Sequence, residues 1–348
     1  MSKVKISKTY GIHTIELYLK NLKYTEVQKV IERLMDSGEI YETKSDYYNI
    51  DRHLKCTYFV EDGIRLRIYQ SHNHSNGIGF VINPSTLLSG KYQPVKLWIP
   101  TPEAVDELQK RLSIVFDMLG LDSVHSTDLS LCQMDVTLNE WGDSSYDPVT
   151  KIRQFRKGII PKGFEVIPNK DKKLNPYLFM VKSKRKNSKK SSSVIVKAYD
   201  KVHELKTNHR YPKKLKDENI LRFEVSMKRE AFLKKLGLNR DASLYEMLRS
   251  GYDQGEALIA DYQGKMYPFT GEIVSYEKAK KTIQEKVKDD LLQGQILYLL
   301  KKTSDSAGLS TATRKLKEHY THVDDRQIKK IFAQFDKLGI SPITLPKK

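Results

Sequence analysis

Residues 133–139 read QMDVTLN, and apolar and polar side chains alternate strictly along them. A period of two is typical of a β-strand that buries one face of a sheet and leaves the other polar. The apolar side consists of Met134, Val136 and Leu138. The polar side consists of Gln133, Asp135, Thr137 and Asn139. The stretch therefore predicts a sheet strand with an acidic group on its polar face.

Two other stretches alternate in the same way. In LRFEVSMK (221–228) the polar side consists of Arg222, Glu224, Ser226 and Lys228. In VIVKAYDK (194–201) the corresponding side consists of Ile195, Lys197, Tyr199 and Lys201. If the three strands are neighbours, one sheet face presents two carboxylates, a tyrosine and several cations. An ordinary solvent-facing surface is the alternative, because most half-buried strands alternate.

Patterns outside these strands predict the rest of the fold. Strands are expected at 11–20, in a hairpin over 56–70 that turns at 61–63, and at 77–84, where Pro84 ends the strand. Helices are expected at 24–37 and at 101–119, where Thr101 caps the helix and Pro102 begins it.

The chain becomes helical from about residue 275, with helices expected at 276–302, 310–320 and 324–338 and an extended segment at 340–345. These helices suit either a helix-turn-helix or a packing subdomain. The order of elements predicts an α+β fold, with a mostly antiparallel central sheet and flanking helices in residues 1–270. A helical C-terminal domain is expected in residues 275–348.

Positive charge is concentrated in one segment of the chain. The 348 residues contain 61 Lys and Arg against 43 Asp and Glu, a net charge of +18. Residues 151–217 hold 21 of these basic residues and only 5 of the acidic ones. They include SKRKNSKKSSS at 183–193, which predicts a flexible basic loop. Such a block attracts polyanions, with nucleic acid the first candidate and anionic lipid the second.

Other classes of protein are excluded by composition. No run of eighteen apolar residues and no secretory signal are present, so we expect a cytoplasmic protein that does not enter a membrane. Two cysteines, Cys56 and Cys132, are too few for a disulfide scaffold or a four-thiolate zinc site.

The predicted polar face suits phosphodiester transfer. Asp135 and Glu224 can hold a divalent metal, Mg²⁺ or Mn²⁺, through hard oxygen ligands. The metal would polarise the scissile phosphate, and the Tyr199 hydroxyl can attack it and form a covalent intermediate. Because the ordinary pKa of tyrosine is about 10, a neighbouring ammonium such as Lys201 would help it to ionise.

Four segments of the sequence resemble motifs of the filamentous-phage gene II/X replication initiators, in the same order. AYDKVHEL (198–205) is similar to the family's Ala-Tyr-x-Lys-x-x-Glu-Leu motif, and INPSTLLSG (82–90) to its Ala-Ser-Pro-x-x-x-Leu-x-Gly segment. QMDVTLN resembles its Arg-Ile-Asp-x-Thr strand, and LRFEVSMKREAFLKKLGL (221–238) resembles its Val-Arg-Phe-Glu strand and the following helix. The likeness spans about residues 56–250.

This resemblance implies a rolling-circle initiator endonuclease in a bacterial host, encoded by a phage, a plasmid or an integrated element. Such an enzyme nicks one strand at an origin, becomes joined to the 5′ phosphate and leaves a 3′ hydroxyl for a polymerase. Single-stranded or supercoiled origin DNA, a host helicase and a DNA polymerase are the implied partners. Tyr199 matches the nucleophile and Lys201 its cationic neighbour. The predicted DNA-binding residues are Lys184, Arg185, Lys186, Lys189, Lys190, Lys197 and Arg222.

The third metal ligand is left open by the sequence. Gln133 stands where the family has arginine, so this position is not expected to be essential. The pair His72 and His74 is a candidate ligand set, with a surface loop as the alternative. The single His203 is a candidate ligand or base, with a structural role as the alternative. The face formed by Arg65, Arg67 and Tyr69 lines either the DNA path or solvent.

Three other functions are alternatives to the endonuclease. A non-catalytic origin-binding protein would use the basic segment and a C-terminal helix-turn-helix. A tyrosine recombinase is disfavoured because no His-x-x-Arg occurs in the chain. An RNA-binding protein fits the charge but leaves the four motifs unexplained.

Overall fold

The computed structural model describes residues 6–37, 40–43, 52–56, 63–72, 76–168, 177–182, 193–212, 215, 218–305 and 308–345. The predicted loop cations Lys184, Arg185, Lys186, Lys189 and Lys190 lie outside these residues, as does His74.

A single antiparallel sheet organises the first part of the chain, which confirms the predicted α+β class. In the described ranges it has ten strands, in the order β2-β3-β4-β5-β1-β6-β10-β9-β8-β7. The strands are β1 (Ser7–Leu22), β2 (Ile40–Thr43), β3 (Arg52–Cys56), β4 (Ile64–Gln70), β5 (Asn76–Ile82), β6 (Ser130–Gly142), β7 (Phe164–Val166), β8 (Leu178–Lys182), β9 (Val194–Asp200) and β10 (Asn219–Lys228).

The three alternating stretches form the middle of this sheet. They are parts of β6, β10 and β9, and β10 pairs with both of the others. Arg222 lies opposite Asn139 on one side and Tyr199 on the other, while Glu224 lies between Thr137 and Lys197. Residues opposite each other in a ladder point to the same face. The prediction that these strands are neighbours with a common polar face is therefore confirmed.

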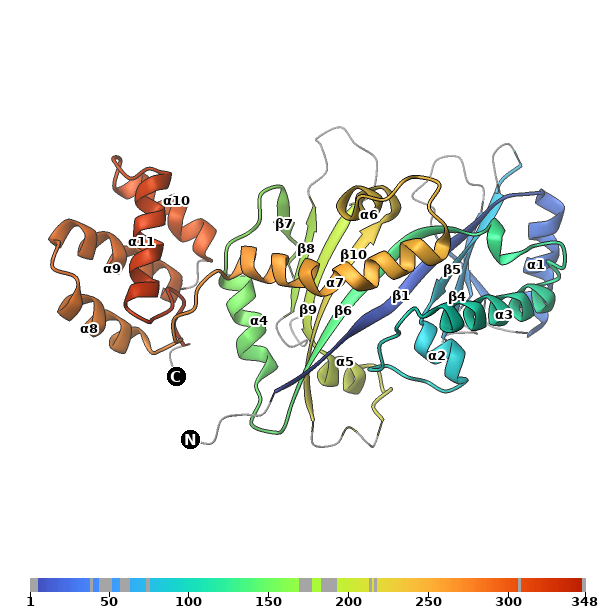
Figure 1. Cartoon of the computed structure of the whole chain (residues 1–348), viewed down its shortest axis with the longest axis horizontal. Coiled ribbons are helices and arrows are strands. Elements are labelled where there is room, and N and C mark those ends of the chain that lie inside the picture. Colours follow the sequence, from blue (N-terminus) through green and yellow to red (C-terminus); the bar gives the residue numbers. More distant parts are fainter. Residues whose placement is uncertain are drawn as a thin grey trace.

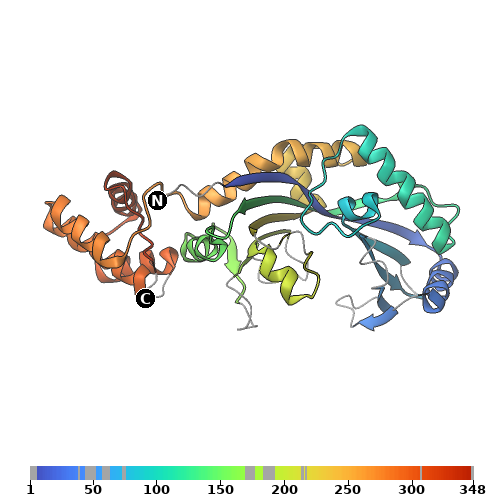
Figure 2. The same ribbon diagram turned by 90° about the horizontal axis from the view of Figure 1, so that it is seen from below.

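Helices cover the apolar face of the sheet. They include α1 (Tyr24–Ser37), α3 (Pro102–Leu119), α4 (Pro148–Lys157), α6 (Arg229–Leu236) and α7 (Leu244–Met266). α7 packs closely on β6, because side chains at Gly251 and Gly255 would overlap Met134 and Val136. Figure 2 shows α7 along the outer side of the curved sheet and α5 (Lys201–Thr207) on the inner side. The polar face is thus the inner one.

Several predicted elements agree with the structure. α3 begins after Thr101, whose side chain accepts the Ala104 N–H at 3.2 Å, and it ends at Gly120 with φ of 71°. β3 and β4 pair as an antiparallel hairpin, although the first strand lies at 52–56 and residues 57–62 are outside the described part. Pro84 follows β5 as expected, and it also begins the short helix α2 (Pro84–Ser89), which Asn83 caps.

Other expectations were wrong. Residues 276–302 form two helices, α8 (Tyr276–Lys286) and α9 (Asp290–Asp305), because the chain is extended at Val287. The 23-residue helix α7 was not predicted. Lys201 does not continue β9: the Asp200 carboxylate accepts the His203 N–H at 2.9 Å and begins α5 at Lys201.

The C-terminal helices have a hydrophobic cluster of their own. α8, α9, α10 (Leu309–His319) and α11 (Asp325–Lys337) surround Ile296, Leu316 and Phe335, apart from the cluster beneath the sheet. Figure 1 shows these helices beyond the C-terminal end of α7. Hydrogen bonds join them to the end of α4 and to the segment after it: the Lys157 ammonium donates to the Thr303 carbonyl at 2.7 Å, and the Ile160 N–H donates to Oγ of Ser310 at 2.8 Å. The domain division near residues 270–275 stays a prediction. In the described part of the chain, no helix has the length and apolar character needed to span a membrane.

Candidate active site

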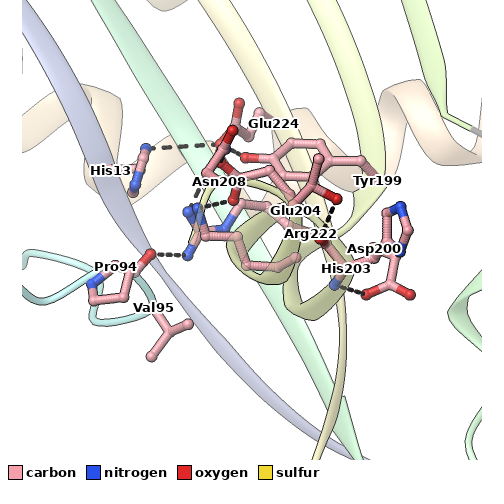
Figure 3. Close-up of polar contacts among 12 residues, drawn as sticks. His13, Pro94, Val95, Tyr199, Asp200, His203, Glu204, Asn208, Arg222 and Glu224 are labelled. Carbon is pink, nitrogen blue, oxygen red and sulfur yellow. Dashed lines mark hydrogen bonds and ion pairs between the residues drawn. The ribbon is translucent and has the colours of Figure 1, made fainter. Parts of the chain in front are cut away.

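The hydroxyl of Tyr199 is held by a buried carboxylate. It donates a hydrogen bond to Oε1 of Glu224 at 2.8 Å, as Figure 3 shows. Tyr199 is partly exposed on β9 and Glu224 is buried on β10. Burial, followed by the negative charge of Glu224, raises the pKa of Tyr199 well above its ordinary value of 10.0. The phenol is therefore protonated at neutral pH and acts as a donor.

Glu224 is the centre of the polar cluster. Its Oε2 accepts a hydrogen bond from the Lys197 ammonium at 3.2 Å, and its Oε1 lies 4.0 Å from Nη1 of Arg222. Burial alone would raise the pKa of Glu224, but the charge of Lys197 and then other neighbouring cations outweigh it and lower the pKa well below 4.5. Glu224 is therefore ionised, and in this arrangement it is a weak base.

Asp135 is the less compensated of the two carboxylates. It is buried on β6, and its Oδ1 accepts a hydrogen bond from Nε2 of Gln133 at 3.2 Å. Burial raises the pKa of Asp135, and the charge of Glu224 raises it further while Lys197 lowers it. An added cation would stabilise the ionised form of such a buried carboxylate. Gln133 thus supports Asp135 through a neutral hydrogen bond.

The described residues contain no complete metal site made of protein ligands alone. Within the described residues, no three His, Cys, Asp or Glu side chains are grouped so that they hold a metal ion. His72, a candidate ligand, is exposed and stacks on the Tyr24 ring at 4.1 Å between centroids. His203 lies on α5 and belongs to no such group.

His13 joins the cluster and was missed by the sequence reasoning. Ile12 and Thr14 pair with the consecutive residues Val136 and Asp135, so that His13 bulges out of the β1–β6 ladder. Its Nδ1 lies 3.7 Å from Oε1 of Glu224 (Figure 3). Burial and the positive charge of Arg222 lower the pKa of His13 well below 6.5, so the imidazole is neutral. A signal was present: His13 and Thr14 interrupt the apolar alternation between Ile12 and Ile15.

Arg222 does not reach the surface, contrary to its predicted role in binding DNA. Its side chain is 0% exposed. Nε donates to Oδ1 of Asn139 at 2.8 Å and Nη2 to the Pro94 carbonyl at 2.9 Å, while Nη1 has no hydrogen-bond partner among the described residues. Arg222 therefore acts on Tyr199 and Glu224 as a fixed positive charge and not as a phosphate ligand.

Lys201 also differs from its predicted role. Its ammonium donates to Oε2 of Glu204 at 2.7 Å and lies 6.0 Å from the centroid of the Tyr199 ring. Burial and the charge of Arg222 lower the pKa of Lys201 from 10.5 to about 8. The expectation that this ammonium makes Tyr199 more acidic fails, because burial and Glu224 dominate the pKa of the phenol.

The polar face continues beyond the cluster towards the edge of the sheet. Arg65, Arg67 and Tyr69 on β4 lie opposite Val81, Gly79 and Gly77, which in turn lie opposite residues of β1. Arg67 reaches across Gly79 to pair with Glu16 at 2.8 Å. The hairpin face and the Tyr199 cluster thus share one side of the sheet. Lys197, with 28% of its side chain exposed, is the cation of the cluster that a ligand can reach from this side.

Comparison with protein-family models and with curated proteins finds no match to the chain. The function is therefore argued from the geometry of this face and from the motifs in the sequence.

Proposed function

We propose that this chain is a rolling-circle replication initiator that cuts and rejoins one DNA strand through Tyr199. The observation that carries the proposal is the hydrogen bond from the Tyr199 hydroxyl to buried Glu224, beside a cation that a ligand can reach, Lys197. The motif resemblance supports origin DNA, single-stranded or supercoiled, as substrate. It also supports a host helicase and DNA polymerase as partners.

The reaction is an exchange of oxygens on phosphorus. The Tyr199 oxygen forms a bond to phosphorus while the bond from phosphorus to the 3′ oxygen breaks. The phenolic proton passes to Oε1 of Glu224, its hydrogen-bond partner, and the departing 3′ oxygen takes up a proton from solvent water. The products are a 5′-phosphotyrosyl strand and a free 3′ hydroxyl. Attack by a 3′ hydroxyl on the phosphotyrosine reverses the sequence and joins the strands.

Without DNA, the raised pKa of Tyr199 and the lowered pKa of Glu224 disfavour this proton transfer. DNA binding would make the transfer more favourable. Lys197 is the leading charge that lowers the pKa of Glu224. A phosphodiester on the polar face competes with Glu224 for this ammonium, because both are anions. When Lys197 turns to the phosphate, Glu224 loses its main compensating charge and becomes a stronger base. The base is thereby activated only when substrate is present.

The divalent ion expected from the sequence fits this face only if a substrate phosphate supplies some of its ligands. Mg²⁺ often takes one or two carboxylates, retains waters and uses substrate phosphates as further ligands. Asp135 would be its main protein ligand, because burial raises the pKa of this carboxylate and an added cation would stabilise its ionised form. Glu224, the second ligand expected from the sequence, could bind the ion only when it is not accepting the phenolic proton. Bound there, the ion would neutralise charge on the phosphate.

A covalent-adduct assay tests the proposal. The protein is mixed with labelled single-stranded oligonucleotides that tile its own replicon, with Mg²⁺ or Mn²⁺, and then denatured. We expect a labelled adduct that is lost in Tyr199→Phe and kept in the matched control Tyr245→Phe, which alters a partly buried tyrosine on α7. An adduct that survives Tyr199→Phe contradicts the proposal. Binding without adduct or cleavage would instead favour the non-catalytic origin-binding protein.

Variants of the carboxylates test their separate roles. Glu224→Gln removes the proton acceptor, and general base catalysis contributes roughly 10²–10⁴ in rate, so we expect a loss of that size in adduct formation. Asp135→Asn should weaken the binding of Mn²⁺ to a Tyr199→Phe protein–DNA complex, measured by electron paramagnetic resonance. Unchanged Mn²⁺ binding would remove Asp135 from the ion site.

A further inference from the structure

α11 carries a surface that the chemistry at Tyr199 does not use. The helix buries Ile328, Ile331 and Phe335 within the C-terminal hydrophobic cluster and packs on α9. Its opposite side is exposed. The residues on that side are Arg326, Lys329, Lys330, Ala333 and Lys337. With about 100° of rotation per residue, these five positions fall within an arc of about 100°. We call them the α11 stripe.

The cations of the α11 stripe form no ion pair with the described residues, unlike several on neighbouring helices. Lys317 pairs with Asp325 at 2.6 Å, Lys281 pairs with Glu285 at 3.8 Å, and Arg314 pairs with Glu318. The Asp336 carboxylate of α11 accepts the Thr270 N–H at 3.2 Å and lies outside the stripe. A row of exposed cations without close ion pairs on a helix attracts a polyanion.

We propose that the α11 stripe docks in the major groove of duplex DNA beside the nicking site. The choice of DNA as the polyanion rests on the proposed function. The stripe extends over eleven residue steps of about 1.5 Å, or about 16 Å, which matches roughly five base pairs at 3.4 Å each. A major groove about 12 Å wide admits a helix, and the small Ala333 allows the backbone to approach the bases.

The surrounding elements have the order of a helix-turn-helix. α10 ends at His319, residues 320–323 form a turn closed by the Val323 N–H to Tyr320 carbonyl hydrogen bond at 2.9 Å, and Asp324 caps α11. In that motif the second helix enters the groove while the first crosses the backbone.

Other polyanions fit the stripe less well. The major groove of A-form RNA is too deep and narrow for side chains to read. An anionic membrane binds helices that also insert an apolar side, and the apolar side of α11 is buried against its neighbours.

Binding measurements on the full chain test the inference. In a Tyr199→Phe background, so that no strand is cut, Arg326→Ala/Lys329→Ala/Lys330→Ala is compared with Lys281→Ala/Lys286→Ala/Lys288→Ala, which removes three exposed cations on and just after α8. Alanine favours helix, so both variants should keep their fold, which circular dichroism checks. The probes are a mixed-sequence DNA duplex, its single strand and an RNA hairpin, titrated over a series of salt concentrations.

We expect the stripe variant to lose about 2 to 3 in the log–log salt slope for duplex binding, because each lost phosphate contact removes about 0.9. The α8 control should keep the slope, and binding of the single strand should change little. An unchanged slope, an equal loss in the control, or a larger effect on the RNA hairpin would overturn the inference. Adduct formation on single-stranded oligonucleotides, measured separately with Tyr199 intact, should be the same in both variants. Failure of the catalytic proposal is thereby distinguishable from failure of this one.

Discussion

Lys201→Met should change how the stability of the protein depends on pH. The folded protein holds the Lys201 pKa at about 8, against an ordinary value of 10.5, because the ammonium is buried and lies near Arg222. Between these two values the unfolded chain binds more protons than the folded one, so stability rises with pH. The gap of about 2.5 corresponds to about 3 kcal/mol at 1.36 kcal/mol for each pKa unit. From about pH 7 to about pH 9, the destabilising effect of Lys201 on the folded protein falls by about 1 kcal/mol.

Urea unfolding at several pH values isolates this contribution. Other groups titrate as well, so the quantity to measure is the difference in unfolding free energy between the parent and Lys201→Met. We expect this difference to shift in favour of the parent by about 1 kcal/mol over that pH interval. Lys206→Met, which alters an exposed lysine on the same helix, should give a constant difference. Parallel curves for the parent and Lys201→Met would refute the reasoning, because they would mean that Lys201 is not destabilised by burial.

Three further predictions concern packing, the phenol and the DNA path. Gly255→Ala should lower stability by about 1–3 kcal/mol, since the new methyl group would overlap Tyr10 and Val136. Gly264→Ala on the same helix meets no atom within 4 Å and should raise stability by about 0.5–1 kcal/mol; thermal unfolding compares the pair, and equal effects would refute close packing of α7. Glu224→Gln should lower the pKa of Tyr199, because the charge that raises it is gone; ultraviolet titration against Tyr199→Phe measures this, and an unmoved pKa would leave burial as the sole cause. Neutralising Arg65 and Arg67 together should flatten the salt slope for single-strand binding by about 1.4, at about 0.7 for each contact, and an unchanged slope would make the β4 face a solvent face.

Local patterns were sufficient to predict much of the fold. β10 covers residues 219–228 and contains the alternating stretch 221–228, and α3 covers residues 102–119 of the helix expected at 101–119. These signals are local, because a strand facing two environments must alternate and a helix must bury one side. The shared face of Asp135, Glu224 and Tyr199 also followed, once their strands proved to be neighbours.

The errors arise where another interaction overrides the pattern. Alternation runs on to Lys201, but the carboxylate of Asp200 caps a helix there and turns the lysine away from β9. α7 was missed because its glycines resemble helix breakers, whereas Gly251 and Gly255 are needed for close contact with β6. The burial of Arg222 depends on Asn139 and on the Pro94 carbonyl, which come from other parts of the chain. Sequence position alone gives no indication of such partners.

The balance of positive and negative side chains on the polar face bears on the proposed chemistry. Asp135 and Glu224 are balanced in sign by Lys197 and Arg222, while Lys201 is paired with Glu204 at 2.7 Å. A phosphodiester adds one negative charge to this balanced set, and buried Arg222 cannot move to meet it. Lys197 is therefore the cation of this set that can turn towards the phosphate, and in doing so it leaves both carboxylates undercompensated. We infer that substrate strengthens Glu224 as a base and creates the demand for a further cation at Asp135. Under the proposed function, the high pKa of Tyr199 and the low pKa of Glu224 would keep the site inactive until DNA binds.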